Sequence, residues 1–133
     1  MKCVVLDTNA YSALLGGDRD VWGLTRQADR VLLPVFVLGE LLAGFRGGSR
    51  LQKNLAALRE FLAQPEVEIA DATAETADIF ARLKVELKQA GTPLPINDVW
   101  IAAQTMEFSA VLVSYDRHFL QIPGLRLWPK LRG

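Results

Sequence analysis

Short apolar runs alternate with longer stretches of helical periodicity along this chain, and that alternation limits the folds open to it. The runs lie at Cys3 to Leu6, Val31 to Leu33, Val67 to Ile69 and Val111 to Val113, with a last short one around Leu125 to Leu127. The first is rich in valine, as buried parallel strands are. Strands that alternate with helices form a mainly parallel sheet with helices on its faces. The sequence therefore predicts an α/β fold, an α/β/α sandwich with a short, mainly parallel central sheet.

Helices are predicted between these runs from apolar periodicity and from end signals. They are expected from Asp7-Thr8 to about Leu15 with Gly16-Gly17 as the stop, over Asp18 to Ala28, over Val35 to Phe45 after Pro34, from a Ser49 cap, from Thr73 to the stop at Gly91-Thr92-Pro93, and from an Asn97-Asp98 cap to about Phe108. The apolar spacing between Val35 and Phe45 predicts a largely buried helix.

The chain has 133 residues, half of them hydrophobic, so it can bury a core and is not disordered. No linker or repeat is visible, and we expect one domain over residues 1–133. The most apolar stretch, Val31 to Phe45, contains Pro34 and Glu40 and falls short of the roughly 20 apolar residues that a membrane span needs. The lone Cys3 cannot form an internal disulfide, which favours a reducing cytoplasm.

Fifteen basic and fifteen acidic side chains give a formal net charge of zero. This balance argues against a protein that coats nucleic acid, which would be basic overall. It permits an enzyme that touches RNA through one local patch. Arg46, Arg50, Lys53 and Arg59 surround a glycine-rich break and are either a solvated helix face or a phosphate track.

Two acidic residues follow predicted strands. Asp7 comes directly after the first strand, and two residues separate Asp116 from the strand that ends at Val113. Ligands of open α/β sheets bind beyond the carboxyl ends of the strands, so both carboxylates have a functional location. Each one taken singly is also a common helix cap or turn residue.

Two further acids lie on predicted helices. Glu40 falls inside the helix that we expect to be largely buried, where an ionised carboxylate is costly unless it is paired or binds a metal. It could instead lie at the edge of the apolar stripe, reaching water or pairing with Arg46. Asp98 is expected in the first turn of its helix, facing inward, where a plain capping role is the alternative.

Together, the four acids indicate a metal site. Carboxylates that are brought together repel one another unless a cation neutralises them. Oxygen ligands of this kind suit Mg²⁺ or Mn²⁺.

The order of these motifs resembles PIN-domain nucleases, and among them the VapC toxins of toxin–antitoxin pairs. The resemblance covers nearly the whole chain and rests on Asp7-Thr8-Asn9, Glu40-Leu41, Asn97-Asp98 with Ile101-Ala102-Ala103, and Ser114-Tyr115-Asp116. It implies a PIN-like fold and a Mg²⁺- or Mn²⁺-dependent endoribonuclease that acts as the toxin of a type II toxin–antitoxin system.

The resemblance also implies a role for each matching residue. Asp7, Glu40 and Asp98 match the acids that bind metal and orient water, and Asp116 matches a fourth, more variable acidic position. Ser114 matches a hydroxyl that assists the site. Thr8 or Asn9 is expected to support Asp7 by hydrogen bonds.

Partners are implied as well: an RNA substrate, with transfer and ribosomal RNA as candidates, a VapB-like antitoxin, and a second copy of the chain. We expect an antitoxin tail near Tyr11 and Phe45, with an Arg or Lys reaching the acidic pocket. The homodimer is expected through the helix from Thr73 and the segment with Pro93 and Pro95.

Two other functions fit less well. An aspartyl phosphotransferase resembling haloacid dehalogenases needs a second Asp two residues after the first, where this chain has Asn9, and it leaves Glu40 unexplained. An interaction module without catalysis would not need intact acids.

The remaining chemistry-bearing side chains are expected to play minor parts. His118, the only histidine, is expected on the surface after Asp116, poorly placed as a base, with a phosphate contact as the alternative. Trp22, Trp100 and Trp128 are expected to be packing residues.

Overall fold

The computed structural model describes residues 2–132 and is built on one four-stranded sheet. The strands are β1 (Cys3–Leu6), β2 (Arg30–Pro34), β3 (Val67–Ala70) and β4 (Val111–Val113). They lie in the order β3-β2-β1-β4, and every pair is parallel. The central strand is fully buried at Val4, Val5 and Leu6, because both faces of the sheet are covered. The predicted parallel α/β/α sandwich is confirmed.

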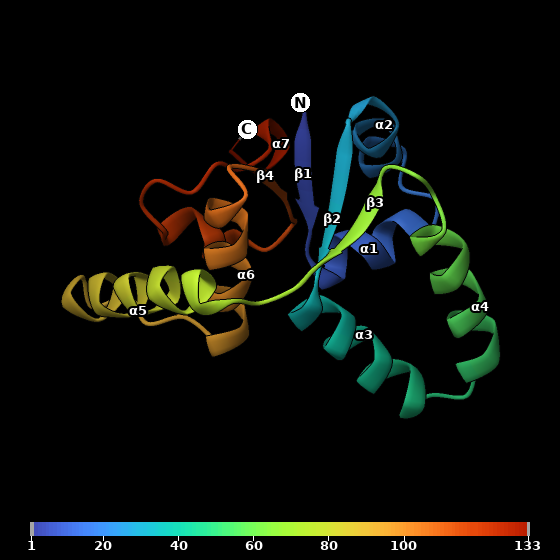
Figure 1. Cartoon of the computed structure of the whole chain (residues 1–133), viewed down its shortest axis with the longest axis horizontal. Coiled ribbons are helices and arrows are strands. Elements are labelled where there is room, and N and C mark those ends of the chain that lie inside the picture. Colours follow the sequence, from blue (N-terminus) through green and yellow to red (C-terminus); the bar gives the residue numbers. More distant parts are fainter. Residues whose placement is uncertain (1, 133) are drawn as a thin grey trace.

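Helices connect the strands and cover the sheet. They are α1 (Thr8–Leu15), α2 (Arg19–Gln27), α3 (Val35–Arg46), α4 (Leu51–Leu62), α5 (Ala74–Gln89), α6 (Ile96–Glu107) and α7 (Pro129–Arg132), with a 3₁₀ turn, η1 (Arg117–Gln121). Figure 1 shows α5 and α6 on one side of the sheet and α4 on the other. No helix among residues 2–132 has the length and apolar character needed to cross a bilayer.

The strand order explains this division of the helices. The chain steps outward from β1 to β2 to β3, then returns past β1 to β4. Since parallel crossovers are right-handed, a reversal of direction moves the connecting helices to the opposite face. The reversal also creates a switch point between β1 and β4, which is where open α/β sheets bind ligands.

Three sequence predictions about element ends were wrong. Ser49 does not cap α4, which begins after Arg50 without a side-chain cap. Helix α6 begins at Ile96, after Pro95, so Asn97 is not its cap, whereas Asp98 lies in its first turn, as expected. The last short strand reduces to a single parallel bridge between Leu112 and Leu127.

The C-terminal segment closes over the free edge of β4. The backbone of Leu112 donates to Arg126 O at 2.8 Å and accepts from Trp128 N at 3.0 Å. Trp128 is 1% exposed, and its indole Nε1 donates to the backbone carbonyl of Ser114 at 2.6 Å. The segment therefore fixes the residue that follows β4, at the switch point.

The Trp128 contact gives a stability prediction. Trp128→Phe keeps an aromatic ring but leaves the buried Ser114 carbonyl without its donor, which costs about 1–3 kcal/mol. The matched change Trp22→Phe, at a side chain that is 57% exposed, should leave stability nearly unchanged. Urea unfolding followed by circular dichroism measures both. Equal effects of the two changes would show that the indole N–H contributes nothing.

Candidate metal-dependent active site

The parallel pairing of β1 with β4 brings two acids together. Leu6 and Val113 are register partners at the ends of these strands, and Asp7 N donates to Val113 O at 3.3 Å. Asp7 follows β1 and Asp116 follows β4 after Ser114 and Tyr115. The predicted location of both carboxylates, beyond the carboxyl ends of the strands, is therefore confirmed.

Asp7 is the most buried of the acids, with 5% of its surface exposed. As the N-cap of α1, its Oδ1 accepts from Ala10 N at 2.8 Å. Its Oδ2 accepts from the Ser114 hydroxyl at 2.5 Å. Ser114 Oγ in turn accepts from Asp116 N at 2.9 Å, so one buried hydroxyl orients both strand-end acids. The capping role considered for Asp7 is therefore confirmed, and the same carboxylate lies at the strand switch point.

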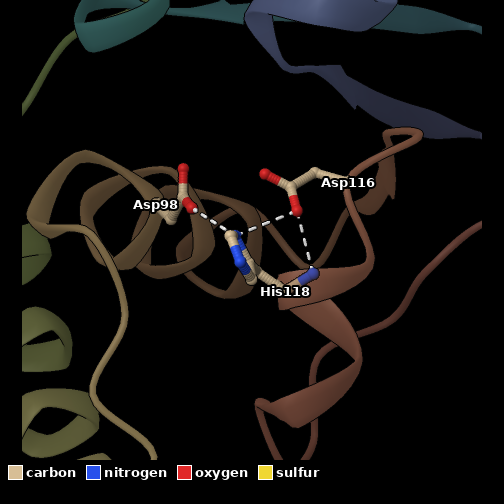
Figure 2. A group of neighbouring side chains, drawn as sticks. All are labelled: Asp98, Asp116 and His118. Atoms are coloured by element: carbon tan, nitrogen blue, oxygen red, sulfur yellow. Dashed lines mark hydrogen bonds and ion pairs between the residues drawn. The ribbon is translucent and has the colours of Figure 1, made fainter.

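Asp98 and Asp116 face each other across the pocket, with His118 between them. Figure 2 shows the imidazole reaching toward both carboxylates. His118 Nδ1 lies 3.1 Å from Asp116 Oδ1 and 3.8 Å from Asp98 Oδ2. The two carboxylates are mostly covered, with 18% of the Asp98 side chain and 28% of the Asp116 side chain exposed. Asp98 comes from the first turn of α6, where the helix dipole favours an anion.

Glu40 reaches the same site from α3, although its surroundings differ from those predicted. Helix α3 buries only Val37 and Leu41 completely, and Glu40 is exposed. Its Oε1 accepts from the Thr8 hydroxyl at 3.0 Å. Thr8 therefore supports Glu40 and not Asp7, and the support of Asp7 comes from Ser114.

All four acids line one open pocket. Its volume is about 500 Å³. The lining consists of Asp7, Thr8, Asn9, Glu40, Pro95, Ile96, Asn97, Asp98, Ile101, Asp116 and His118. The pocket thus receives one acid from the chain after β1, one from the chain after β4, and one from each of the helices α3 and α6.

Burial and mutual repulsion make the pocket unfavourable for negative charge. The pKa of Asp7 is raised to about 6, mainly by burial and to a smaller extent by the charges of Asp116 and Asp98, while the hydrogen bonds from Ser114 and Ala10 oppose the rise. Burial also raises the pKa of Asp98, as do the charges of Asp116 and Glu40, and His118 lowers it. These couplings show that the four carboxylates share one electrostatic environment.

The donor set fits a divalent cation. The pocket offers carboxylate oxygens from four residues, and hard divalent ions bind such oxygens. Ligand atoms of Asp98, Asp116 and His118 lie within 4.8 Å of one another. A positive ion there would offset the repulsion that raises the pKa values of Asp7 and Asp98.

The expectations for the nearby histidine and tryptophans were right in part. His118 is exposed, as predicted, but it faces the acids. Trp22 is exposed and is not a packing residue, whereas Trp128 is buried. Trp100 lies half-buried in a stack with Phe36 and Phe80. The position of His118, two residues after Asp116, was the sequence signal that could have placed its side chain in the pocket.

The raised pKa of Asp7 predicts how stability depends on pH without metal. Folded Asp7 holds its proton up to about pH 6, whereas an unfolded Asp releases it near pH 4. The folded state therefore binds more protons in this window, and its stability falls as the pH rises from 4 through 6, by on the order of 2–3 kcal/mol.

Asp7→Asn should remove most of that fall. In EDTA, the variant should be more stable than wild type at pH 7.5, since the buried charge is gone, and the advantage should shrink toward pH 4. Denaturant unfolding at several pH values measures this, with Asp29→Asn on the exposed surface as control. A variant less stable than wild type at pH 7.5 would identify Asp7 as an ordinary structural cap.

Comparisons with known proteins agree with this geometry. Residues 4–125 match the model of the PIN domain. Ribonuclease VapC2 of Rickettsia felis is 30% identical over 133 residues, covering 95% of this chain and 98% of the relative. A similar solved structure is the crystal structure of VapBC2 from Rickettsia felis bound to a promoter DNA fragment. One of its chains aligns with a TM-score of 0.83 at 27% identity, and the alignment covers 94% of this chain and 96% of that chain.

A second solved structure points the same way. It is a member of the VapBC family of toxin-antitoxin systems, VapBC-5, from Mycobacterium tuberculosis. It aligns with a TM-score of 0.73 at 25% identity and covers 96% of each chain. With the fold, the acid-lined pocket and a family match over most of its length, this chain belongs to the PIN-domain family.

Proposed function

We propose that this chain is a Mg²⁺- or Mn²⁺-dependent endoribonuclease that cleaves RNA phosphodiester bonds and acts as the toxin of a type II toxin–antitoxin pair. The observation that carries the proposal is the convergence of Asp7, Glu40, Asp98 and Asp116 on one pocket at the strand switch point. Membership of the PIN-domain family and similarity to a VapC ribonuclease support it.

The four carboxylates would hold the cation, and the buried groups behind them would keep them in place. Asp98 and Asp116 lie close enough to share one ion, and Asp7 and Glu40 line the same pocket. When bound, a divalent cation supplies charge stabilisation and an activated water for phosphodiester hydrolysis.

The residues of the chain contribute orientation and proton handling. Ser114 holds the Asp7 carboxylate through Oδ2, and Ala10 N holds Oδ1, so the buried carboxylate cannot rotate freely. Thr8 fixes one oxygen of Glu40 and leaves the other available to accept a proton from water. Glu40 is exposed, which gives it access to solvent at the pocket mouth. We assign Glu40 the role of orienting the attacking water.

The substrate is RNA that can enter an open pocket as a single strand. Transfer and ribosomal RNA remain the candidate classes. An aspartyl phosphotransferase is not supported, since the pocket has Asn9 where that chemistry requires a second Asp. We further propose that the protein works in the cytoplasm and that residues 1–133 form a single domain.

The antitoxin site needs revision in the light of the structure. Tyr11 is 1% exposed and packs edge-on against Phe61, so it cannot line an open groove. A groove of about 260 Å³ lies beside it instead, with Leu14, Leu15, Trp22 and Phe61 in its walls. Leu15 and Trp22 are 47% and 57% exposed. We propose that an antitoxin segment covers this groove.

A homodimer would use a different surface. Val85 of α5 is 54% exposed and borders a pocket that also contains Pro93 and Leu94. The α5 side therefore remains our proposed contact between two copies.

Metal dependence is the first test of the proposed function. Cleavage of single-stranded RNA should require Mg²⁺ or Mn²⁺, stop with EDTA, and fall at least about 100-fold in Asp7→Asn and Asp98→Asn, because each change removes a charge that holds the cation. Mn²⁺ should raise the melting temperature of wild type and raise that of Asp7→Asn much less. Asp29→Asn should behave as wild type. Full activity in either pocket variant, or cleavage in EDTA, contradicts the proposal.

The antitoxin groove is tested by co-purification from the native operon. The complex should show lower RNase activity than the free chain. Trp22→Asp places a charge in the apolar groove and should reduce recovery of the partner, whereas Val85→Asp on α5 should not. Recovery of only free, active protein from the operon, or equal partner recovery with all variants, argues against this groove.

A further inference from the structure

His118 also lines the pocket, and the four carboxylates alone give it no role. Its ring lies between Asp98 and Asp116, with Nδ1 as the nitrogen that faces both (Figure 2). Just over half of the side chain is exposed, at 55%, so the ring is not held there by burial in the core. Its position must come from the local backbone and from the two acids.

The local backbone sets that position. Asp116 caps η1, and its Oδ1 accepts from His118 N at 2.9 Å. This turn places the His118 backbone directly beside the Asp116 carboxylate. The His118 side chain therefore projects from a residue that already lines the pocket. The next residue, Phe119, is 1% exposed and anchors the turn in the core. The imidazole is therefore presented to the acids by a fixed turn.

We infer that His118 Nδ1 is a ligand of the pocket cation, together with carboxylate oxygens of Asp98 and Asp116. The inference rests on the proposed metal-dependent function and adds a nitrogen to its ligand set. Neighbouring ligands of an octahedral ion with bonds of about 2.1 Å lie about 3 Å apart, and opposite ones about 4 Å apart. The separations of 3.1 and 3.8 Å from Nδ1 to the two carboxylates fall within that span.

A nitrogen ligand changes which ions the pocket favours. Mg²⁺ prefers oxygen ligands, whereas imidazole suits transition metals. A site with two carboxylates and one imidazole should therefore bind Mn²⁺ more tightly than Mg²⁺. A pocket with carboxylates alone would discriminate less between them.

The competing role for His118 is a hydrogen bond from Nδ1 to Asp116 that merely orients the carboxylate. His118→Gln separates the two roles, because its amide can still donate a hydrogen bond to Asp116 but supplies no imidazole nitrogen. Gln121→Ala is the matched control, at an exposed residue in the same turn.

The decisive experiment reads nitrogen coordination directly. The untagged full chain is loaded with Mn²⁺, and pulsed electron paramagnetic resonance detects the coupling of a bound ¹⁴N nucleus. Because His118 is the only histidine in the chain, an imidazole signal has one source. We expect the coupling in wild type and in Gln121→Ala, and its loss in His118→Gln.

Calorimetry with Mn²⁺ and Mg²⁺ gives the second readout. His118→Gln should weaken Mn²⁺ binding by at least about tenfold and change Mg²⁺ binding much less. Bound Mn²⁺ without ¹⁴N coupling, or an unchanged Mn²⁺ to Mg²⁺ affinity ratio in His118→Gln, overturns the inference and leaves the carboxylate site standing. No binding of Mn²⁺ to wild type would overturn the inference and the proposed metal site together.

Discussion

The parallel pairing of β1 with β4 is the constraint on which the site depends. The pairing aligns Leu6 with Val113, so the two residues that follow, Asp7 and Ser114, meet at the edge of the sheet. Their hydrogen bond joins the ends of two strands that are more than a hundred residues apart in the chain. Trp128 adds a second tie from the C-terminal segment to Ser114. The geometry of the acids thus follows from the topology of the sheet.

The same arrangement places function and stability in opposition. Asp7 loses solvent on burial and faces the charges of Asp98 and Asp116, which is why its pKa rises. A purely structural position would accommodate Asn better than Asp. Retaining a buried carboxylate among like charges is explained when a cation belongs to the working state, because binding of the cation then supplies the missing favourable interaction.

The sequence was informative where chain order determines position. Asp7 and Asp116 could be located because they follow short apolar runs that predict buried parallel strands, and Asp98 because a helix begins just before it. Glu40 was placed on the correct helix with the wrong environment, since apolar spacing does not reveal how much of α3 the sheet covers. Within α3, only Val37 and Leu41 are completely buried.

His118 and Trp22 show the other limit of sequence reasoning. The direction of the His118 ring depends on a 3₁₀ turn capped by Asp116, and no periodic pattern encodes such a turn. Trp22 has the hydrophobicity of a core residue, yet it lies on the outer face of α2, where the structure leaves it 57% exposed. The direction of the His118 ring and the exposure of Trp22 both depend on tertiary contacts, which local sequence patterns do not reveal.

The most direct measurement of the central claim is the position of the cation itself. Crystals grown with Mn²⁺ and measured at the manganese absorption edge would locate the ion by anomalous scattering. An anomalous peak is expected within coordination distance of Asp98 and Asp116, inside the pocket that Asp7 and Glu40 also line. A fully occupied peak elsewhere on the protein, with none among these carboxylates, would contradict it.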